Sequence, residues 1–417
     1  MKKGTRKYIA SPETTSIWSV LEEHMKQKAG EMLQYVLEAE VGDFIKRHES
    51  RLDEKGKRSV VRNGFMPERV LQTSVGPVKI SQPRIDDRKM TGEDGYEHFQ
   101  SSILPKFARR SPTLDVAIPV LYLKGISTGD IEGSLRALLG PNVDALSAQT
   151  VVRLKEKWEI DYREWMKRSL TAKNYVYIWA DGIHMSVRME DEKSCLLVVL
   201  GADEEGNKEL LTVVDGFRES AESWKEVLRD LKNRGVEKVP KLAIGDGALG
   251  FWRALEDIFP PTKHQRCWVH KIRNVLDKTH RSVQGKAKGM LHEIVMAPSR
   301  AEAEKAFNRF ASTFKDKYPK AVECLEKDRV ELLTFYNFPA AHWESIRSTN
   351  PIESMFATVR LRTYKTRGMC SRATVLTMTY KLGIEAQKTF RKLNQPDRVK
   401  EVWIGKIFED GELREAA

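Results

Sequence analysis

Residues 174–259 limit the fold more tightly than any other part of the chain, because strand and helix patterns follow one another there in a fixed order. A long strand is expected over NYVYIWADGIHMSVRME (174–190), and two more over CLLVVLGADEEGNKELLTVVDGF (195–217) around an acidic, glycine-containing turn. A helix from Ser220, a strand in KLAIGDG (241–247) and a helix over 249–259 follow. This order predicts an α/β core in which helices flank a mixed sheet.

Helical patterns dominate on both sides of this core. Apolar residues at three- and four-residue spacing predict a helix over 15–50, and VLQTSVGPVKISQPR (70–84) predicts a small β-hairpin at Gly76-Pro77. Residues 279–345 show helical patterns only. We divide the chain into a helical region with a hairpin (1–110), a helix-turn-helix-like region (111–172), the first part of the core (173–278), an all-α insertion (279–345), closing core helices (346–395) and a tail (396–417).

Two helices within 111–172 resemble a DNA-reading unit. One is expected over 127–139 and the next from Ser147, whose first turns would present Gln149, Thr150 and Arg153. These residue types can read base edges in DNA. The connection over 140–147 is longer than the usual turn of about 3–4 residues, so a plain helical linker remains an equal alternative.

The positive charge of the chain is concentrated in two stretches. The net charge is +12, yet residues 261–290 hold eight Lys/Arg against one acid and residues 360–392 hold nine against one. Such clustering is typical of a nucleic-acid-binding surface, so a nucleic acid is the expected partner. A solvated helix face is the alternative for each stretch taken alone.

Cysteine use and hydropathy indicate an intracellular location. The four cysteines are scattered without a C-x-x-C pair, which is typical of reduced thiols in a cytosolic protein. No apolar run approaches the ~20 residues that a membrane span needs. We therefore expect a cytoplasmic, nucleoid-associated protein that does not contact the membrane.

Three acidic residues are candidates for chemistry. Asp181 shares a strand face with Trp179, and Asp246 follows KLAI between two glycines that would let a ligand approach closely. Glu353 lies in STNPIES (348–354), where Asn350 suits the N-cap of a helix and Glu353 would occupy the N3 position of a capping box. A turn or cap role for each acid therefore stays open beside a catalytic one.

Taken together, the three acids can form one metal site. Mg²⁺ and Mn²⁺ prefer oxygen ligands and bind through a few carboxylates plus substrate phosphates. Two such ions about 3.5–4 Å apart can activate a water or a 3′-hydroxyl and stabilise the leaving oxygen of a phosphodiester. We expect two Mg²⁺ or Mn²⁺ ions held by Asp181, Asp246 and Glu353.

A nucleotide-binding motif competes for part of this site. Residues 245–250 match G-x-G-x-x-G between a strand and a helix, as a dinucleotide site requires. Asp246 would place a carboxylate beside the pyrophosphate, and the region about twenty residues further on, HQRCWVHKIRN, has no acid for the ribose. The motif therefore fails as a dinucleotide fingerprint.

Four motifs resemble, in their order and spacing, those of Mutator-like bacterial insertion-sequence transposases: WADGIHMSVR, AIGDGALGFWRAL, HQRCWVHKIRNVL, and STNPIES followed by Arg360 and Arg362. QTSVGPVKISQPR, YLKGISTGDIEGSLRALLG and SAQTVVRL extend the resemblance into the N-terminal half. The resemblance implies an RNase H-like core interrupted by an all-α insertion. It also implies an Asp-Asp-Glu metal site at Asp181, Asp246 and Glu353.

The same resemblance singles out Cys267 and His270 as the C-x-x-H element of the family and leaves its role open. The pattern places both on one helix face, opposite Val269 and Ile272. A zinc site with His264 is an alternative. Structural zinc almost always takes four ligands, however, and no second pair lies nearby in the sequence.

The expected function is that of a transposase acting as a homo-oligomer, with a dimer on DNA as the simplest form. It would bind terminal inverted repeats, cut a phosphodiester and join the freed end to target DNA. Six basic residues are expected to contact phosphates: Lys271, Arg273, Arg360, Arg362, Lys365 and Arg367. Two alternatives are an RNase H-like nuclease without strand transfer and a DNA-binding regulator that has lost the chemistry.

Overall fold

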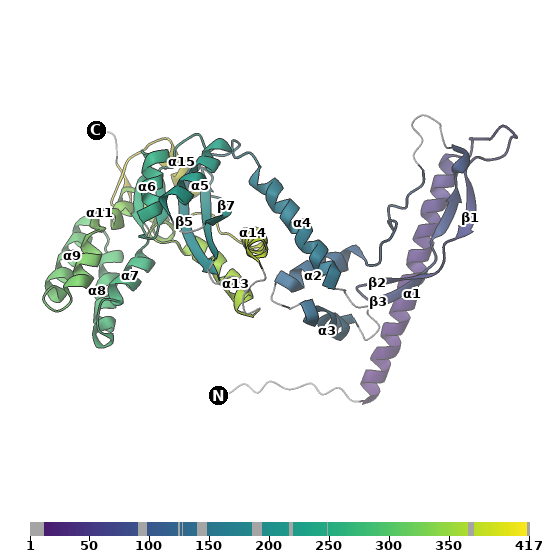
Figure 1. The fold of residues 1–417 in the computed structure, drawn as a ribbon, viewed down its shortest axis with the longest axis horizontal. Helices are drawn as coiled ribbons and strands as arrows, with labels where there is room; N and C mark the ends of the chain where they lie inside the picture. The colour runs from purple at the N-terminus through teal and green to yellow at the C-terminus, as the bar shows by residue number, and fades with distance from the viewer. Residues whose placement is uncertain are drawn as a thin grey trace. The chain divides into compact units, whose positions relative to one another are not determined.

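A computed structural model describes residues 12–90, 98–123, 126, 128–139, 148–185, 194–216, 220–247, 249–365 and 371–414 (Figure 1). The chain forms two compact units, Met1–Val152 and Arg153–Ala417. Their boundary falls inside helix α4 (Ala148–Met166), so the expected 111–172 region is divided between the two units.

The first unit packs a long helix against short antiparallel strands. Helix α1 spans Pro12–Arg47, and the strands are β1 (Val61–Phe65), β2 (Arg69–Thr73), β3 (Gly76–Ile80) and β4 (Pro83–Asp86), paired as β1 with β4 and β2 with β3. Leu37 of α1 packs on Leu71, Val78 and Ile80 of the hairpin. The predicted helix and hairpin are confirmed. Helices α2 (Pro112–Leu123) and α3 (Thr128–Leu139) follow, and the 140–147 connection lies outside the described residues.

The second unit is built on a five-stranded mixed sheet, which confirms the predicted α/β core. Its order is β7-β6-β5-β8-β9. Strand β6 (Ser194–Asp203) runs antiparallel to both β5 (Tyr175–Met185) and β7 (Lys208–Gly216). Strands β8 (Leu242–Gly245) and β9 (Lys263–Arg266) run parallel to β5. The carboxyl ends of β8 and β9 therefore lie level with Ala180, in the middle of β5.

Helices cover the two faces of this sheet. Helices α5 (Ala221–Asn233) and α6 (Leu249–Ile258) bury Trp224, Leu228 and Phe251 against Ile178 and Ala180 of β5. Helix α13 (Asn350–Lys365) contacts β5 and β6, and α14 (Arg372–Gln387) contacts β7 (Figure 1). Since neighbouring residues of a strand point to opposite faces, Tyr177, Trp179 and Asp181 point to the α13 side.

The sequence does not predict strand β9. Its residues, Lys-His-Gln-Arg, lack the apolar alternation that marks a strand. The strand forms because β8 offers a free edge and because the buried side chain of Gln265 bonds to a later segment: its amide donates to Leu332 O at 3.2 Å, and its oxygen accepts from Phe335 N at 2.8 Å.

Residues 279–345, all of which the structure describes, contain helices and 3₁₀ turns, as the pattern predicts. The helices are α8 (Gln284–Val295), α9 (Arg300–Phe314), α10 (Pro319–Glu326), α11 (Arg329–Leu332) and α12 (Trp343–Ile346). They follow α7 (Trp268–Leu276), and α11 contacts β9. Helix α15 (Pro396–Trp403) and a short hairpin of β10 (Phe408–Glu409) and β11 (Glu412–Leu413) close the chain. Within the described residues, no helix has the length and apolar character that a membrane crossing requires.

Candidate active site

One face of β5 leads directly to the candidate acids. The hydroxyl of Tyr177 lies 2.8 Å from His342 Nδ1, and the indole of Trp179 donates to Ser345 O at 3.0 Å. Asp181 is the next residue on this face. The segment before α13 therefore runs along β5, and this path brings the start of α13 to Asp181.

The ends of β8 and β9 add two more residues beside Asp181. Ala180 pairs with Gly245 and Gly245 pairs with Arg266 across the parallel strands. Asp246 and Cys267 are consequently the next residues on their strands, and the Cys267 N–H donates to Gly245 O at 2.8 Å. The parallel arrangement explains how residues 65 or more positions apart in the chain reach one sheet edge.

Asp181, Glu353 and His270 converge at this edge. One potential ligand atom from each lies within 4.8 Å of the others. His270, in the first turn of α7, has Nε2 3.1 Å from Glu353 Oε1 and Nδ1 3.9 Å from Asp246 Oδ1. The three predicted acids therefore gather around His270, with Asp246 at the margin of the cluster.

Glu353 does not act as a capping-box residue in this structure. Helix α13 begins at Asn350, and the Thr349 carbonyl accepts from the N–H groups of Ile352 and Glu353 at 2.9 and 3.0 Å. The carboxylate of Glu353 instead contacts His270 and, at 3.2 Å, the guanidinium of Arg360. The cap interpretation of STNPIES is therefore wrong for this residue, and Thr349 holds the N-cap position.

Burial and mutual charge control protonation in the cluster. Burial raises the pKa of Asp181 to about 7, opposed by the charge of His270 and increased by Glu353. The hydrogen bond from His270, followed by that from Arg360, lowers the pKa of Glu353 to about 2. The Cys267 sulfur, followed by the Glu353 carboxylate, raises the pKa of His270 to about 11. The imidazolium is thus the cation that balances these acids at neutral pH.

The donor set fits a divalent cation. Among the described residues, Asp181, His270 and Glu353 form the only cluster of three such side chains with this spacing. Carboxylate oxygens are the ligands that Mg²⁺ and Mn²⁺ prefer, whereas His270, as an imidazolium, could ligate an ion only after losing its proton. Burial raises the pKa of Asp181 although the charge of His270 opposes the shift, and a bound cation would add further positive charge beside this carboxyl group.

Cys267 occupies a different place from the one predicted. It is the N-cap of α7, not a residue of the helix face, and it is buried. Its Sγ accepts from both the N–H and the hydroxyl of Thr349, each at 3.3 Å. His264, the suggested zinc partner, packs against Trp252, with the ring centroids 4.8 Å apart and the planes tilted by 40°. These contacts give no support to a zinc site. Thr349 is the functional neighbour that the sequence interpretation missed, because Asn350 looks like the stronger N-cap.

One predicted phosphate contact is wrong. Lys271 is only 4% exposed, and its ammonium pairs with Asp328 and donates to Cys324 O at 2.9 Å. Burial next to a carboxylate leaves it unavailable to DNA. Arg153 and Arg273 are exposed, as expected. Four other predicted DNA contacts lie in helices, but the structure does not describe their side chains: Gln149, Thr150, Arg362 and Lys365. Arg367 lies outside the described residues.

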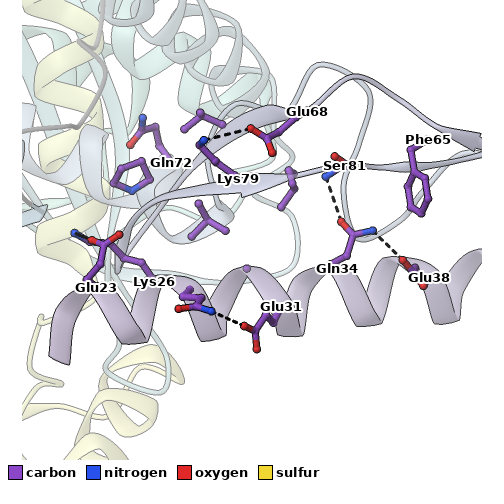
Figure 2. A pocket seen from close by; sticks show the side chains of 16 residues that line it. Glu23, Lys26, Glu31, Gln34, Glu38, Phe65, Glu68, Gln72, Lys79 and Ser81 are labelled. Atoms are coloured by element: carbon purple, nitrogen blue, oxygen red, sulfur yellow. Dashed lines mark hydrogen bonds and ion pairs between the residues drawn. The ribbon is translucent and has the colours of Figure 1, made fainter. Parts of the chain in front are cut away.

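A groove in the first unit has the wrong charge for DNA. It encloses about 1070 Å³ between α1 and the β2–β3 hairpin. Figure 2 shows Lys79 paired with Glu68 on the strand side of the groove, and Gln34 of α1 bonded to Ser81 and Glu38. Four glutamates and two lysines line it, and none of the predicted site residues does. This net negative charge would repel the phosphates of a DNA backbone.

Comparisons with known proteins agree with the sequence motifs. Residues 3–392 match the family described as transposase, Mutator family. The transposase of insertion sequence element IS6120 from Mycolicibacterium smegmatis is 48% identical over 298 residues, covering 72% of this chain and 92% of that protein. The transposase of IST2 from Acidithiobacillus ferrooxidans is 46% identical over 288 residues, covering 67% and 95%.

A solved structure, the Drosophila P element transposase strand transfer complex, aligns with 76% of this chain and 87% of its own at 11% identity and a TM-score of 0.28, a likeness too distant to carry a conclusion. The family match, in contrast, covers both units and every predicted acid. The chain therefore belongs to the Mutator family of transposases.

Proposed function

We propose that this protein binds the terminal inverted repeats of an insertion sequence, hydrolyses a phosphodiester at each end to free a 3′-hydroxyl, and joins that hydroxyl to target DNA. The convergence of Asp181 and Glu353 at one sheet edge, with Asp246 on the neighbouring strand, supports this proposal best. We interpret the five-stranded sheet as an RNase H-like core and residues 279–345 as its all-α insertion. An element has two ends, so a homodimer would supply one active site for each.

In this proposal Asp181, Asp246 and Glu353 hold two Mg²⁺ or Mn²⁺ ions. When bound, the ions activate the attacking water or 3′-hydroxyl and stabilise the leaving oxygen. Asp181 lies on β5, and its Oδ1 accepts from the Gly182 N–H at 2.9 Å, which orients the carboxylate. Glu353 is oriented by hydrogen bonds from His270 and Arg360. The chain thus contributes a rigid, preorganised set of oxygen ligands.

The proposed DNA contacts fall into two sets, one near the candidate acids and one at the start of α4. Arg273 and Arg360 lie close in sequence to His270 and Glu353, respectively. Both are assigned to contacts with phosphates near the scissile bond. Arg153, with Gln149 and Thr150, is assigned to recognition of the repeat. Phosphate contacts would position the duplex, whereas base contacts from the start of α4 would specify it.

Glu353→Gln tests the proposal directly. We expect Mg²⁺- or Mn²⁺-dependent cleavage of an end-repeat duplex to fall by ~10²-fold or more, because the amide cannot replace a charged ligand. DNA binding and thermal stability should change little, since glutamine keeps the shape and can still accept hydrogen bonds. Glu344→Gln is the matched control: it makes the same change at an exposed glutamate in the first turn of α12.

Equal cleavage by wild type and Glu353→Gln would refute the role of Glu353. The two alternative functions give other outcomes. A nuclease would cut but would not join a 3′-hydroxyl to a second duplex, and a regulator that has lost the chemistry would bind the repeat without cutting it under any metal. Strand-joining products from the wild-type chain would exclude both.

A further inference from the structure

Cys267 sits where three elements of the active site meet. Its N–H is bonded to Gly245 O at the end of β8, and it caps α7, which carries His270. Its Sγ accepts two hydrogen bonds from Thr349, the residue that caps α13, which carries Glu353. Cys267 is 2% exposed and Thr349 is fully buried, so water does not compete for these bonds.

We propose that Thr349 and Cys267 are positioning residues, in which the Cys267 sulfur holds the start of α13 against the start of α7 and thereby places Glu353 beside His270 and Asp181. A parallel backbone bond supports the same junction, because Trp268 N–H donates to Arg347 O at 3.0 Å. The inference rests on the proposed catalytic role of Glu353 and adds a use for two residues that touch no reacting atom.

The geometry explains why both donors of Thr349 are used. Its carbonyl accepts from the Ile352 and Glu353 N–H groups, so the direction of the first turn of α13 follows the orientation of Thr349. One hydrogen bond from the N–H would leave the residue free to rotate about that bond. The second bond, from the hydroxyl, removes this freedom. A glutamate four residues further on is therefore held within the few tenths of an ångström that metal ligation requires.

Thr349→Val separates this role from general stability. Valine keeps the shape and the N–H but removes the hydroxyl, whereas Thr349→Ser keeps both donors. The matched control is Thr212→Val on β7: Thr212 is also fully buried, and its hydroxyl also donates to a sulfur, Met166 Sδ, at 3.7 Å. We expect Thr349→Val to raise amide exchange in peptides covering residues 348–356 about fivefold. Thr212→Val should leave that exchange unchanged.

Cleavage gives the second readout on the full chain. With saturating Mn²⁺ and end-repeat DNA, the single-turnover rate of Thr349→Val should fall roughly 10- to 100-fold while DNA affinity stays within about twofold. Thr349→Ser should recover most of the rate. Cys267→Ala should reproduce the exchange defect of Thr349→Val, because it removes the acceptor of both bonds. Its rate should fall at least as far, because it also removes the sulfur next to His270.

The outcomes distinguish this inference from the proposed function. Unchanged exchange at residues 348–356 in both Thr349→Val and Cys267→Ala would overturn it whatever the cleavage result. Faster exchange with a cleavage rate no lower than that of Thr212→Val would also overturn it, because the junction would then have no role in placing Glu353. Faster exchange in a chain whose wild type cuts no DNA would support the junction and refute the catalytic proposal instead.

Discussion

His342 is a buried histidine that should make the stability of the second unit depend on pH. It is fully buried, with Nε2 3.5 Å from the Gln395 carbonyl oxygen and Nδ1 2.8 Å from the Tyr177 hydroxyl. Because a carbonyl can only accept, Nε2 carries the proton and the neutral ring accepts from Tyr177 at Nδ1. Burial lowers the pKa of His342 from 6.5 to about 4. Between these values the unfolded chain binds more protons, so stability falls as the pH falls through this window.

Protonation of His342 is expected to lower the free energy of unfolding by about 2 kcal/mol between pH 7 and pH 5. Urea unfolding of wild type and His342→Gln at both pH values measures it: the variant lacks the titrating ring and should lose about 2 kcal/mol less over the same interval. Parallel losses in the two proteins would show that His342 is not the source. The basic groups facing the ring, Arg398 and Lys208, act in the same direction, because both oppose its protonation.

Single residues also show how far the sequence predicts the site. Asp181 and Asp246 are predictable because an acid in or just after an apolar strand has no structural reason to be there. Glu353 is ambiguous, since the same local pattern suits a helix cap, and only its contacts with His270 and Arg360 decide. Lys271 is mispredicted because a basic stretch does not reveal which of its side chains faces a buried carboxylate such as Asp328.

At the scale of elements, the strand β9 depends on one buried amide. Gln265 is fully buried and satisfies Leu332 O, Arg266 O and Phe335 N. Gln265→Met keeps the approximate length but leaves these groups unpaired, and we expect it to lower the free energy of unfolding by about 2–3 kcal/mol. Gln284→Met is the control, because Gln284 is partly exposed and donates one bond, to Leu276 O at 3.0 Å. Its expected cost is below about 1 kcal/mol.

Chemical denaturation of the two variants tests this expectation, and equal costs would contradict it. Strand β9 also shows why part of the fold cannot be predicted from the sequence. Strands β5 to β8 carry runs of consecutive apolar residues, and α5 carries its apolar residues in a helical period, so each is predictable from its own pattern. Strand β9 has no pattern of its own. Its partners, Leu332 and Phe335, are about seventy residues away, and only the folded chain brings them to Gln265.

At the scale of the whole molecule, the net charge of +12 should appear as a strong salt dependence of DNA binding. Each phosphate that a basic residue neutralises contributes about 0.9 to the slope of log K against log salt concentration. Only exposed side chains can contribute, so the two basic stretches should contribute less than their composition suggests. Lys271 and Arg273 lie two residues apart on α7 and differ in this respect: Lys271 is buried and Arg273 is exposed.

Arg273→Ala and Lys271→Met form a matched pair for this test. Arg273→Ala should lower the salt slope by about 1 and should weaken binding to end-repeat and unrelated duplexes by the same factor. It should change the free energy of unfolding by less than about 0.5 kcal/mol. Lys271→Met should leave the slope unchanged and cost about 3 kcal/mol of stability, because Asp328 would stay buried with only Arg266, at 3.7 Å, to balance it. Titrations of end-repeat and unrelated duplexes at several salt concentrations, with denaturation of each variant, measure both quantities. A lower salt slope for Lys271→Met than for wild type would mean that this lysine leaves Asp328 and contacts DNA when the complex forms. The complex would then expose more basic side chains to DNA than the free chain does.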